Sequence, residues 1–321
     1  MVDRALTVER LVRPEQLGEL IPIRRITHFI LLEGWFKIST AEEAFLFDRM
    51  ALKILKVDPT IGHRTSTREI KEYLNSALDP TVSENYPPSV EFGTTSTCNR
   101  SCASCIQAHQ DMGRYEASEA HWFSFVSQLA RHCASTPDQD HPVVHLHWYN
   151  EPLLDRRILS RLRDLRGAGV DNVVFMTNGD SLTDAKLDEV AALTELCIVA
   201  AKSEDIYRRY SPFNLSAKNI VCLDHERYNL TVHGYNRCGT VPLTSGRRRA
   251  RCTRGFNIQI DHDGSIYLCA NDMGRSHRYG HLDYHNIFEL WNTEPLLTWR
   301  VELNSGQFTG NPCALCTHDY T

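Results

Sequence analysis

Short apolar runs alternate with longer amphipathic stretches from residue 89 onward. The apolar runs have the length and the Val, Ile and aromatic content of strands, and they cover residues 89–95, 142–149, 170–179, 195–201 and 219–223. Apolar residues recur at helical spacing in the stretches between them, at 117–133, 155–168 and 183–193. Strands that alternate with helices predict β-α units, in which helices cover a parallel sheet.

The same pattern predicts a partial barrel. The run LTVHGY at 230–235 adds one further strand, which leaves the series short of the eight that a complete barrel needs. Beyond it, FNIQIDHDGSIYLC at 256–269 predicts a β-hairpin, because its Asp263-Gly264 pair is typical of tight turns. One helix is predicted over 286–303. The fold class is therefore α/β, a TIM-like partial (β/α)6 barrel followed by a small domain of hairpin and helix.

The first 88 residues lack this alternation. The stretches TAEEAFLFDRMALKILKV at 40–57 and STREIKEYLNSAL at 66–78 favour helices, and Pro and Gly turns separate such stretches. We expect a mainly helical accessory segment without a catalytic site. The domains are then predicted at 1–88, 89–237 and 238–321.

Composition excludes several classes of partner. The chain has 321 residues, of which 42% are hydrophobic, enough for a substantial core. Its 35 basic and 40 acidic side chains give a net charge of −5, so no overall positive field would recruit nucleic acid or an anionic membrane. The amino terminus has no apolar signal region, and no stretch approaches the roughly 18 apolar residues of a membrane span. We expect a cytoplasmic protein with neither nucleic-acid nor membrane partners.

Three of the 11 cysteines lie close together directly after the first predicted strand. Cys98, Cys102 and Cys105 follow the pattern C-x3-C-x2-C. A structural zinc site normally takes four protein ligands, often as C-x2-C pairs. Three cysteines instead leave one iron of a [4Fe-4S] cluster open to an exogenous ligand. The spacing therefore favours an iron-sulfur cluster on this loop.

A second group of cysteines lies in the carboxy-terminal part. Cys252, Gly264 and Cys269 follow the pattern C-x11-G-x4-C, and Cys313 and Cys316 form a C-x2-C pair. Four thiolates can bind either zinc or an iron-sulfur cluster, and the spacing alone does not decide between them.

Together these motifs resemble those of the radical S-adenosylmethionine (radical SAM) superfamily with a C-terminal Twitch domain, the short form of the SPASM domain. The resemblance implies a partial (β/α)6 barrel that binds S-adenosylmethionine (SAM) at a first [4Fe-4S] cluster. It also implies an auxiliary [4Fe-4S] cluster held by all four carboxy-terminal cysteines. The reductant would be an external electron donor of the flavodoxin or ferredoxin type.

The resemblance also implies contacts to SAM. HWYNEPLLD follows the second predicted strand, where the superfamily often has a Gly-Gly-Glu turn that receives the amino group of the methionine. Asn150 and Glu151 take that role here, although Tyr149 and Asn150 stand in place of the two glycines. FMTNGDSL resembles the Thr-Asn-Gly strand end near SAM, which makes Thr177 and Asn178 cofactor contacts. A strand-end turn explains Asn and Gly there equally well.

Four cysteines remain after these assignments. Cys133, Cys197 and Cys222 lie in apolar stretches and are expected in the core. Cys238 differs, because it follows the last predicted barrel strand and precedes Gly239 in a predicted turn. It is either a structural thiol or a hydrogen-atom donor at the carboxyl end of the barrel.

The similarity to Twitch enzymes of aminoglycoside biosynthesis implies two competing reactions. Epimerases of the neomycin C type return a hydrogen atom from a cysteine and invert a carbon of a carbohydrate. Dehydrogenases of 2-deoxy-scyllo-inosamine oxidise a secondary alcohol and pass an electron to the auxiliary cluster. We expect an epimerase in which Cys238 is the donor, with the dehydrogenase as the alternative. Peptide modification is a rival, against which the absence of a winged-helix pattern in 1–88 argues.

Acidic residues near the predicted strand ends bear on the substrate. Glu91, Glu151 and Asp261 could bind a polyamine, although solvent exposure explains most acidic residues in any protein. We expect a small carbohydrate as the substrate.

Overall fold

The computed structural model describes residues 86–136, 141–213, 219–224, 236–242, 252, 257–310 and 312–316, together with the backbone of the strands at 8–9, 28–32, 35–39, 44–48 and 53–57. The predicted strand at 230–235 lies outside the described residues. None of the helices in this part of the chain is both long and apolar enough to cross a membrane.

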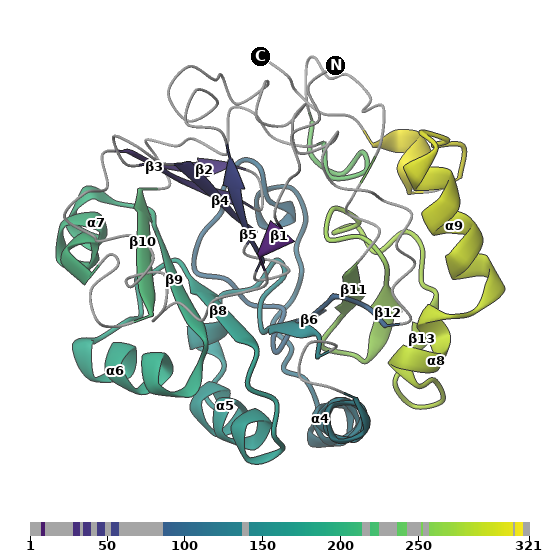
Figure 1. Ribbon diagram of the computed structural model, residues 1–321, viewed down its shortest axis with the longest axis horizontal. Helices are drawn as coiled ribbons and strands as arrows, with labels where there is room; N and C mark the ends of the chain where they lie inside the picture. Colours follow the sequence, from purple (N-terminus) through teal and green to yellow (C-terminus); the bar gives the residue numbers. More distant parts are fainter. Residues whose placement is uncertain are drawn as a thin grey trace.

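The barrel strands confirm the sequence pattern and run parallel in the order β10-β9-β8-β7-β6. They are β6 (Ser89–Phe92), β7 (Val143–His145), β8 (Val173–Thr177), β9 (Leu196–Ala201) and β10 (Ile220–Asp224). The helices of the barrel lie outside these strands (Figure 1) and are α4 (Glu119–Ser135), α5 (Ile158–Gly167), α6 (Asp184–Leu193) and α7 (Glu204–Tyr210). The short helices η2 (Ile106–Ala108), η4 (Pro152–Leu154) and η5 (Ser211–Phe213) interrupt the loops.

Successive side chains along β6 point alternately to the helical layer outside the sheet and to the interior of the barrel. Phe92 stacks on Phe125 of α4, with ring centroids 4.7 Å apart, and meets the edge of Trp122 at 5.5 Å. Because successive strand side chains point to opposite faces, Glu91 points away from α4 and toward the interior of the barrel. Polar side chains can therefore line the interior while the helical layer stays apolar.

The carboxy-terminal hairpin continues the barrel sheet. β11 (Asn257–Ile260) pairs parallel with β6, and β12 (Ser265–Tyr267) and β13 (Gly280–His281) extend the sheet with antiparallel pairs. The predicted turn between β11 and β12 is confirmed, and Gly264 adopts a φ of 84°, which favours glycine. The two parts of the chain thus share one eight-stranded sheet.

The helix predicted over 286–303 is divided in two. α8 (Ile287–Trp291) and α9 (Glu294–Asn304) are separated at Thr293, which caps α9, and Pro295 lies in the first turn of α9. A proline ring clashes with the carbonyl four residues earlier, so a helix cannot run through it unbroken. The break lets α9 fold back, and Arg300 then donates a hydrogen bond of 2.8 Å to the Trp291 carbonyl. The short helix η7 (Cys313–Leu315) follows.

The expectation of a helical segment at 40–57 is wrong. An antiparallel sheet of order β1-β5-β4-β3-β2 occupies the amino-terminal part, built from β1 (Val8–Glu9), β2 (His28–Leu32), β3 (Trp35–Ser39), β4 (Ala44–Asp48) and β5 (Lys53–Val57). The apolar residues of 44–57 fit both periodicities, and pairing with the aromatic and β-branched strand β3 decides for strands. The predicted helix at 66–78 lies outside the described residues.

Candidate active site

Three thiols meet on the loop after β6. The amide of Cys105 donates a hydrogen bond of 2.8 Å to the carbonyl of Cys102, and Cys105 begins η2. Burial, together with the nearby Glu151 carboxylate and the sulfurs of Cys105 and Cys102, raises the pKa of Cys98 to about 11. Burial raises the pKa of Cys105 as well. The predicted triplet is therefore one site, and bound metal would be needed to hold these sulfurs as thiolates.

The spacing of the sulfurs fits a cluster better than a single zinc ion. Zinc–sulfur bonds of about 2.3 Å in a tetrahedron place ligand sulfurs about 3.8 Å apart. Among the described residues, no three cysteine sulfurs lie within 4.8 Å of one another. A larger inorganic core such as a [4Fe-4S] cluster can hold thiolates that are farther apart.

The cluster loop is fastened to the end of β8. Asn99 donates a hydrogen bond of 2.9 Å to Asp180 and accepts one of 2.7 Å from the side-chain Nδ2 of Asn178, while Arg100 forms an ion pair with Asp180. Lys202, directly after β9, contacts the sulfur of Cys102, although burial lowers the pKa of this lysine. These polar partners fix the loop at the carboxyl ends of three strands, where parallel β/α folds place their active sites.

Glu151, Thr177 and Asn178 form one buried group. The Glu151 carboxylate, which is 2% exposed, accepts hydrogen bonds from the Thr177 hydroxyl at 2.7 Å and the Asn178 amide at 2.7 Å. Its third donor is the amide of Leu153 at 3.0 Å. Burial raises the pKa of Glu151, and these hydrogen bonds oppose the rise. One carboxylate therefore joins the ends of β7 and β8 beside the cysteine loop.

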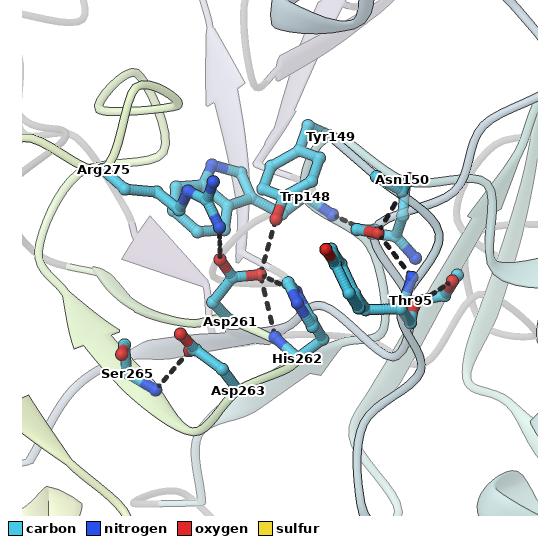
Figure 2. A network of polar contacts seen from close by, with 12 residues as sticks. Thr95, Trp148, Tyr149, Asn150, Asp261, His262, Asp263, Ser265 and Arg275 are labelled. Carbon is cyan, nitrogen blue, oxygen red and sulfur yellow. Dashed lines mark hydrogen bonds and ion pairs between the residues drawn. The ribbon is translucent and has the colours of Figure 1, made fainter. Parts of the chain in front are cut away.

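Asn150 and Tyr149 have polar partners outside that group (Figure 2). The side-chain oxygen of Asn150 accepts from the backbone N–H of Trp148 at 2.9 Å, while its buried Nδ2 has no hydrogen-bond partner among the described residues. The Tyr149 hydroxyl donates a hydrogen bond of 2.7 Å to Asp261, at the end of β11. Tyr149, at the first of the two glycine positions, thus connects the end of β7 to the carboxy-terminal hairpin.

Asp261 is the centre of a polar network that the sequence did not reveal. Its carboxylate accepts from the amide and the ring of His262, both at 2.8 Å, and pairs with Arg275 at 3.3 Å. Burial would raise the pKa of Asp261, but the hydrogen bonds from His262 and Tyr149 outweigh it and lower the pKa. His262 also stacks on Tyr115 of the loop after β6, with ring centroids 5.4 Å apart.

A second unpredicted feature is a row of buried polar side chains inside the barrel. Gln259, Glu91 and His145 are paired in register across β11, β6 and β7, and they are 0%, 4% and 1% exposed. Neither polar atom of the Gln259 side-chain amide has a hydrogen-bond partner in the part of the chain that the structure describes. Solvent exposure, the alternative explanation for the acids near the strand ends, does not apply to Glu91, Glu151 and Asp261, which are all buried. Strand alternation alone could have indicated that this row faces the interior.

The carboxy-terminal cysteines also converge. The pKa of Cys313 is raised by burial and by the nearby sulfurs of Cys269, Cys252 and Cys316. The amide of Asn271 donates to the Cys269 sulfur at 3.4 Å, a contact that suits a metal-bound thiolate. Cys269 follows β12, Cys313 and Cys316 lie in and directly after η7, and Cys252 precedes β11, so this donor set of four thiols fits one cluster.

Cys238 lies against this second group of thiols. Its sulfur makes hydrogen-bond contacts with the sulfurs of Cys269 and Cys316, and together with burial they raise the pKa of Cys238. Arg237, Cys238 and Gly239 all have positive φ, which is a strained conformation for the first two.

The turn that carries Cys238 contacts both cysteine sites. Asn236 donates a hydrogen bond of 2.6 Å to the Leu315 carbonyl, between Cys313 and Cys316. Arg237 donates one of 3.0 Å to the Ser104 carbonyl in the first cysteine loop and another to Asn271. These contacts hold the strained turn between the two groups of thiols.

Comparison with solved structures identifies the fold. The crystal structure of BtrN in complex with AdoMet and 2-DOIA superposes with a TM-score of 0.61 and 21% identity, over 71% of this chain and 92% of BtrN. BtrN in an open conformation gives a TM-score of 0.53 and 18% identity, over 70% of this chain and 90% of BtrN. The chain therefore has the BtrN fold. Streptococcus suis SuiB bound to precursor peptide SuiA gives a TM-score of 0.42 and 10% identity over 90% and 93%, which is too low to support an inference.

Comparisons of sequence gave no further relative. The sequence matches no protein-family model, and a search of curated proteins found no significant match. Its likeness to BtrN thus rests on the structure.

Proposed function

We propose that the chain is a radical SAM enzyme of the Twitch type. The observation that carries this proposal is the convergence of Cys98, Cys102 and Cys105 beside buried Glu151, in a fold shared with an AdoMet-bound structure. The three thiols would hold a [4Fe-4S] cluster, and Glu151 would orient SAM through its amino group. When bound, this cluster supplies the electron that cleaves SAM, and the resulting 5′-deoxyadenosyl radical removes a hydrogen atom from a C–H bond.

The second group of thiols would hold an auxiliary [4Fe-4S] cluster, with Cys252, Cys269, Cys313 and Cys316 as ligands. Their mutual proximity and the N–H donor to Cys269 support this assignment. A cluster saturated by protein ligands cannot bind the substrate directly, so its role would be electron transfer.

Dehydrogenation is the reaction that the position of Cys238 supports best. A thiol that returns a hydrogen atom must be free to face the substrate carbon, whereas Cys238 contacts two ligands of the auxiliary site. In the dehydrogenase, the substrate H–C–OH group would lose a hydrogen atom to the deoxyadenosyl radical, then a proton to a base and an electron to the auxiliary cluster, which leaves a ketone. The likeness to BtrN, solved with 2-DOIA, supports a hydroxylated amine as the substrate.

Epimerisation is the second candidate. Its support is the turn at 236–240, which contacts the loop of the first cluster through Arg237 as well as the auxiliary site. A rotation of the Cys238 side chain would turn the thiol from the auxiliary ligands toward the barrel. The thiol would then donate a hydrogen atom and be regenerated by an electron and a proton.

A peptide substrate is favoured by one observation, the amino-terminal antiparallel sheet. Among the described strands β2 pairs only with β3, and an edge strand can accept an extended peptide as an additional strand. The sequence argument against this substrate class assumed helices, which is wrong for 40–57. A carbohydrate remains the first choice because BtrN is the stronger structural match.

The test is product analysis in deuterated buffer under anaerobic, dithionite-reduced conditions with SAM. 2-DOIA, aminocyclitols and aminoglycosides are supplied to the wild type, to Cys238→Ala and to a matched control, Cys133→Ala. Dehydrogenation predicts 5′-deoxyadenosine and a product lacking two hydrogens, which Cys238→Ala still forms if it retains its iron. An inverted product with one deuterium that Cys238→Ala cannot form would support epimerisation instead. Absence of SAM cleavage by a protein with about eight irons would refute the radical SAM assignment.

A further inference from the structure

We propose that His121, His281 and Asp283 form a binding site for a divalent transition-metal cation such as Zn²⁺, separate from both cysteine sites. Among the described residues, these are the three metal-ligating side chains whose ligand atoms all lie within 4.8 Å of one another. Two imidazole nitrogens and one carboxylate are a known zinc donor set, with water in the fourth position. The inference does not rest on the proposed function.

The carboxylate of Asp283 lies close to a ring nitrogen of each histidine. Zinc bonds of about 2.0–2.1 Å to nitrogen and about 2.0–2.2 Å to oxygen place neighbouring ligand atoms about 3.4 Å apart. His121 Nε2 lies 3.1 Å from Asp283 Oδ1, and His281 Nδ1 lies 3.4 Å from the other carboxylate oxygen, Oδ2. One ligand atom from each residue lies within 4.8 Å of the others, so the three would draw closer together around an ion.

Hydrogen bonding and exposure decide how a cation would enter the site. The backbone N–H of Asp283 donates a hydrogen bond of 3.2 Å to His281 Nδ1, and a bound cation would displace this N–H from the nitrogen lone pair. The Asp283 side chain is 61% exposed, while those of His121 and His281 are 19% and 14% exposed. A cation from solvent can therefore reach the site, and the two rings are still held by their surroundings.

Packing fixes the two histidines in place. The His121 ring lies against Gly264, where an added Cβ would approach the ring to 3.0 Å. Tyr284 stacks on His281 with ring centroids 5.5 Å apart, and the rings of His121 and His281 meet edge to face at 5.3 Å. Little side-chain entropy would be lost on binding, which favours affinity.

The site would join two parts of the chain that are far apart in sequence. His121 lies in the first turn of α4, and His281 and Asp283 lie at the end of β13. Gln128 of α4 already accepts from the amide of Ile287 at 2.7 Å, so the two elements are in register without a metal. A bound cation would fasten the barrel helix to the carboxy-terminal hairpin and raise the stability of the whole protein.

The test uses the anaerobically reconstituted protein and compares variants with matched controls, so that any zinc bound by the cysteines adds equally to all of them. Equilibrium dialysis against micromolar Zn²⁺ and elemental analysis measure zinc per chain, and thermal unfolding measures stability. The variants are Asp283→Asn and His281→Gln. The matched controls are Asp171→Asn, which also removes a carboxylate that is 61% exposed, and His277→Gln, an exposed histidine outside the site.

We expect one zinc per chain in the wild type and both controls, and a midpoint temperature that rises with zinc concentration. Asp283→Asn and His281→Gln should weaken zinc binding at least tenfold and abolish the zinc-dependent rise, while iron content stays unchanged. Equal zinc binding by the wild type and both site variants would overturn the proposal. So would the absence of zinc binding by the wild type, since the three side chains would then be only a hydrogen-bonded group.

Discussion

Replacing Glu151 with glutamine tests the buried carboxylate that joins β7 to β8. Glutamine keeps the size of the side chain but exchanges one acceptor oxygen for an NH2 donor. The wild-type carboxylate accepts from Asn178 on one oxygen and from Leu153 and Thr177 on the other. Whichever way the amide turns, its NH2 group faces the backbone N–H of Asn178 or Leu153. One buried donor therefore loses its acceptor.

The cost follows from the burial of this group. A buried donor without an acceptor costs about 1–3 kcal/mol. At about 2 °C per kcal/mol for a large domain, the midpoint of thermal unfolding should fall by about 2–6 °C. The variant also lacks the charge that would receive the amino group of SAM. A hydrogen bond to a charged group contributes about 1.5–3 kcal/mol, so SAM binding should weaken about 10- to 100-fold.

Calorimetry of the reconstituted protein measures the midpoint, and 5′-deoxyadenosine formed at increasing SAM concentrations measures binding. Glu189→Gln is the control, because that carboxylate is 37% exposed and pairs with Arg163 on the surface of α6. It should change neither quantity. If Glu151→Gln unfolds at the wild-type temperature and cleaves SAM with wild-type concentration dependence, both roles assigned to Glu151 are wrong.

Three further predictions concern the cysteines and the core. Cys98→Ala should reduce the iron content from about eight to about four per chain and abolish SAM cleavage. Cys313→Ala should lose the auxiliary iron and still cleave SAM. Identical losses in the two variants would contradict the presence of two separate sites. Cys197 is fully buried, and burial raises its pKa to about 12. Maleimide should therefore not label this thiol in the native protein between pH 8 and pH 10, as measured by peptide mass spectrometry. Rapid labelling at pH 8 would disprove its position in the core. Arg161→Leu should cost about 3–5 kcal/mol in urea unfolding, because the buried carboxylate of Asp155 loses its nearest cation, now 3.2 Å away, and is left with the more distant Arg157 at 3.8 Å. Adding Asp155→Leu should restore part of that loss, and additive losses would refute the pairing.

Features carried by neighbouring residues could be predicted from the sequence. The β-α alternation, the hairpin turn at Asp263-Gly264 and the C-x3-C-x2-C loop all depend on spacings within about 15 residues, and the structure has the strands, the turn and the converging thiols. The spacing of apolar residues gave the wrong prediction at 44–57, where it fits a helix and a strand equally well. Pairing between strands decides such a case, and it is not a local property of the sequence.

The sequence could not place side chains that meet across strands. The pairing of β11 with β6 brings Gln259 beside Glu91, and Tyr149 meets Asp261 from 112 residues away. Acidic residues are usually exposed, but these contacts bury Glu91 and Asp261 inside the protein.

Cys238 shows most directly what the sequence determines and what only the tertiary structure decides. The sequence alone determined that this thiol belongs to neither predicted ligand set and follows the barrel. Only the tertiary structure decided that it lies against Cys269 and Cys316, because the strained turn at 236–240 is held there by contacts with Leu315, Ser104 and Asn271. The spacing of ligands can be read from neighbouring residues in the sequence. The surroundings of a side chain depend instead on which distant segments the folded sheet brings together.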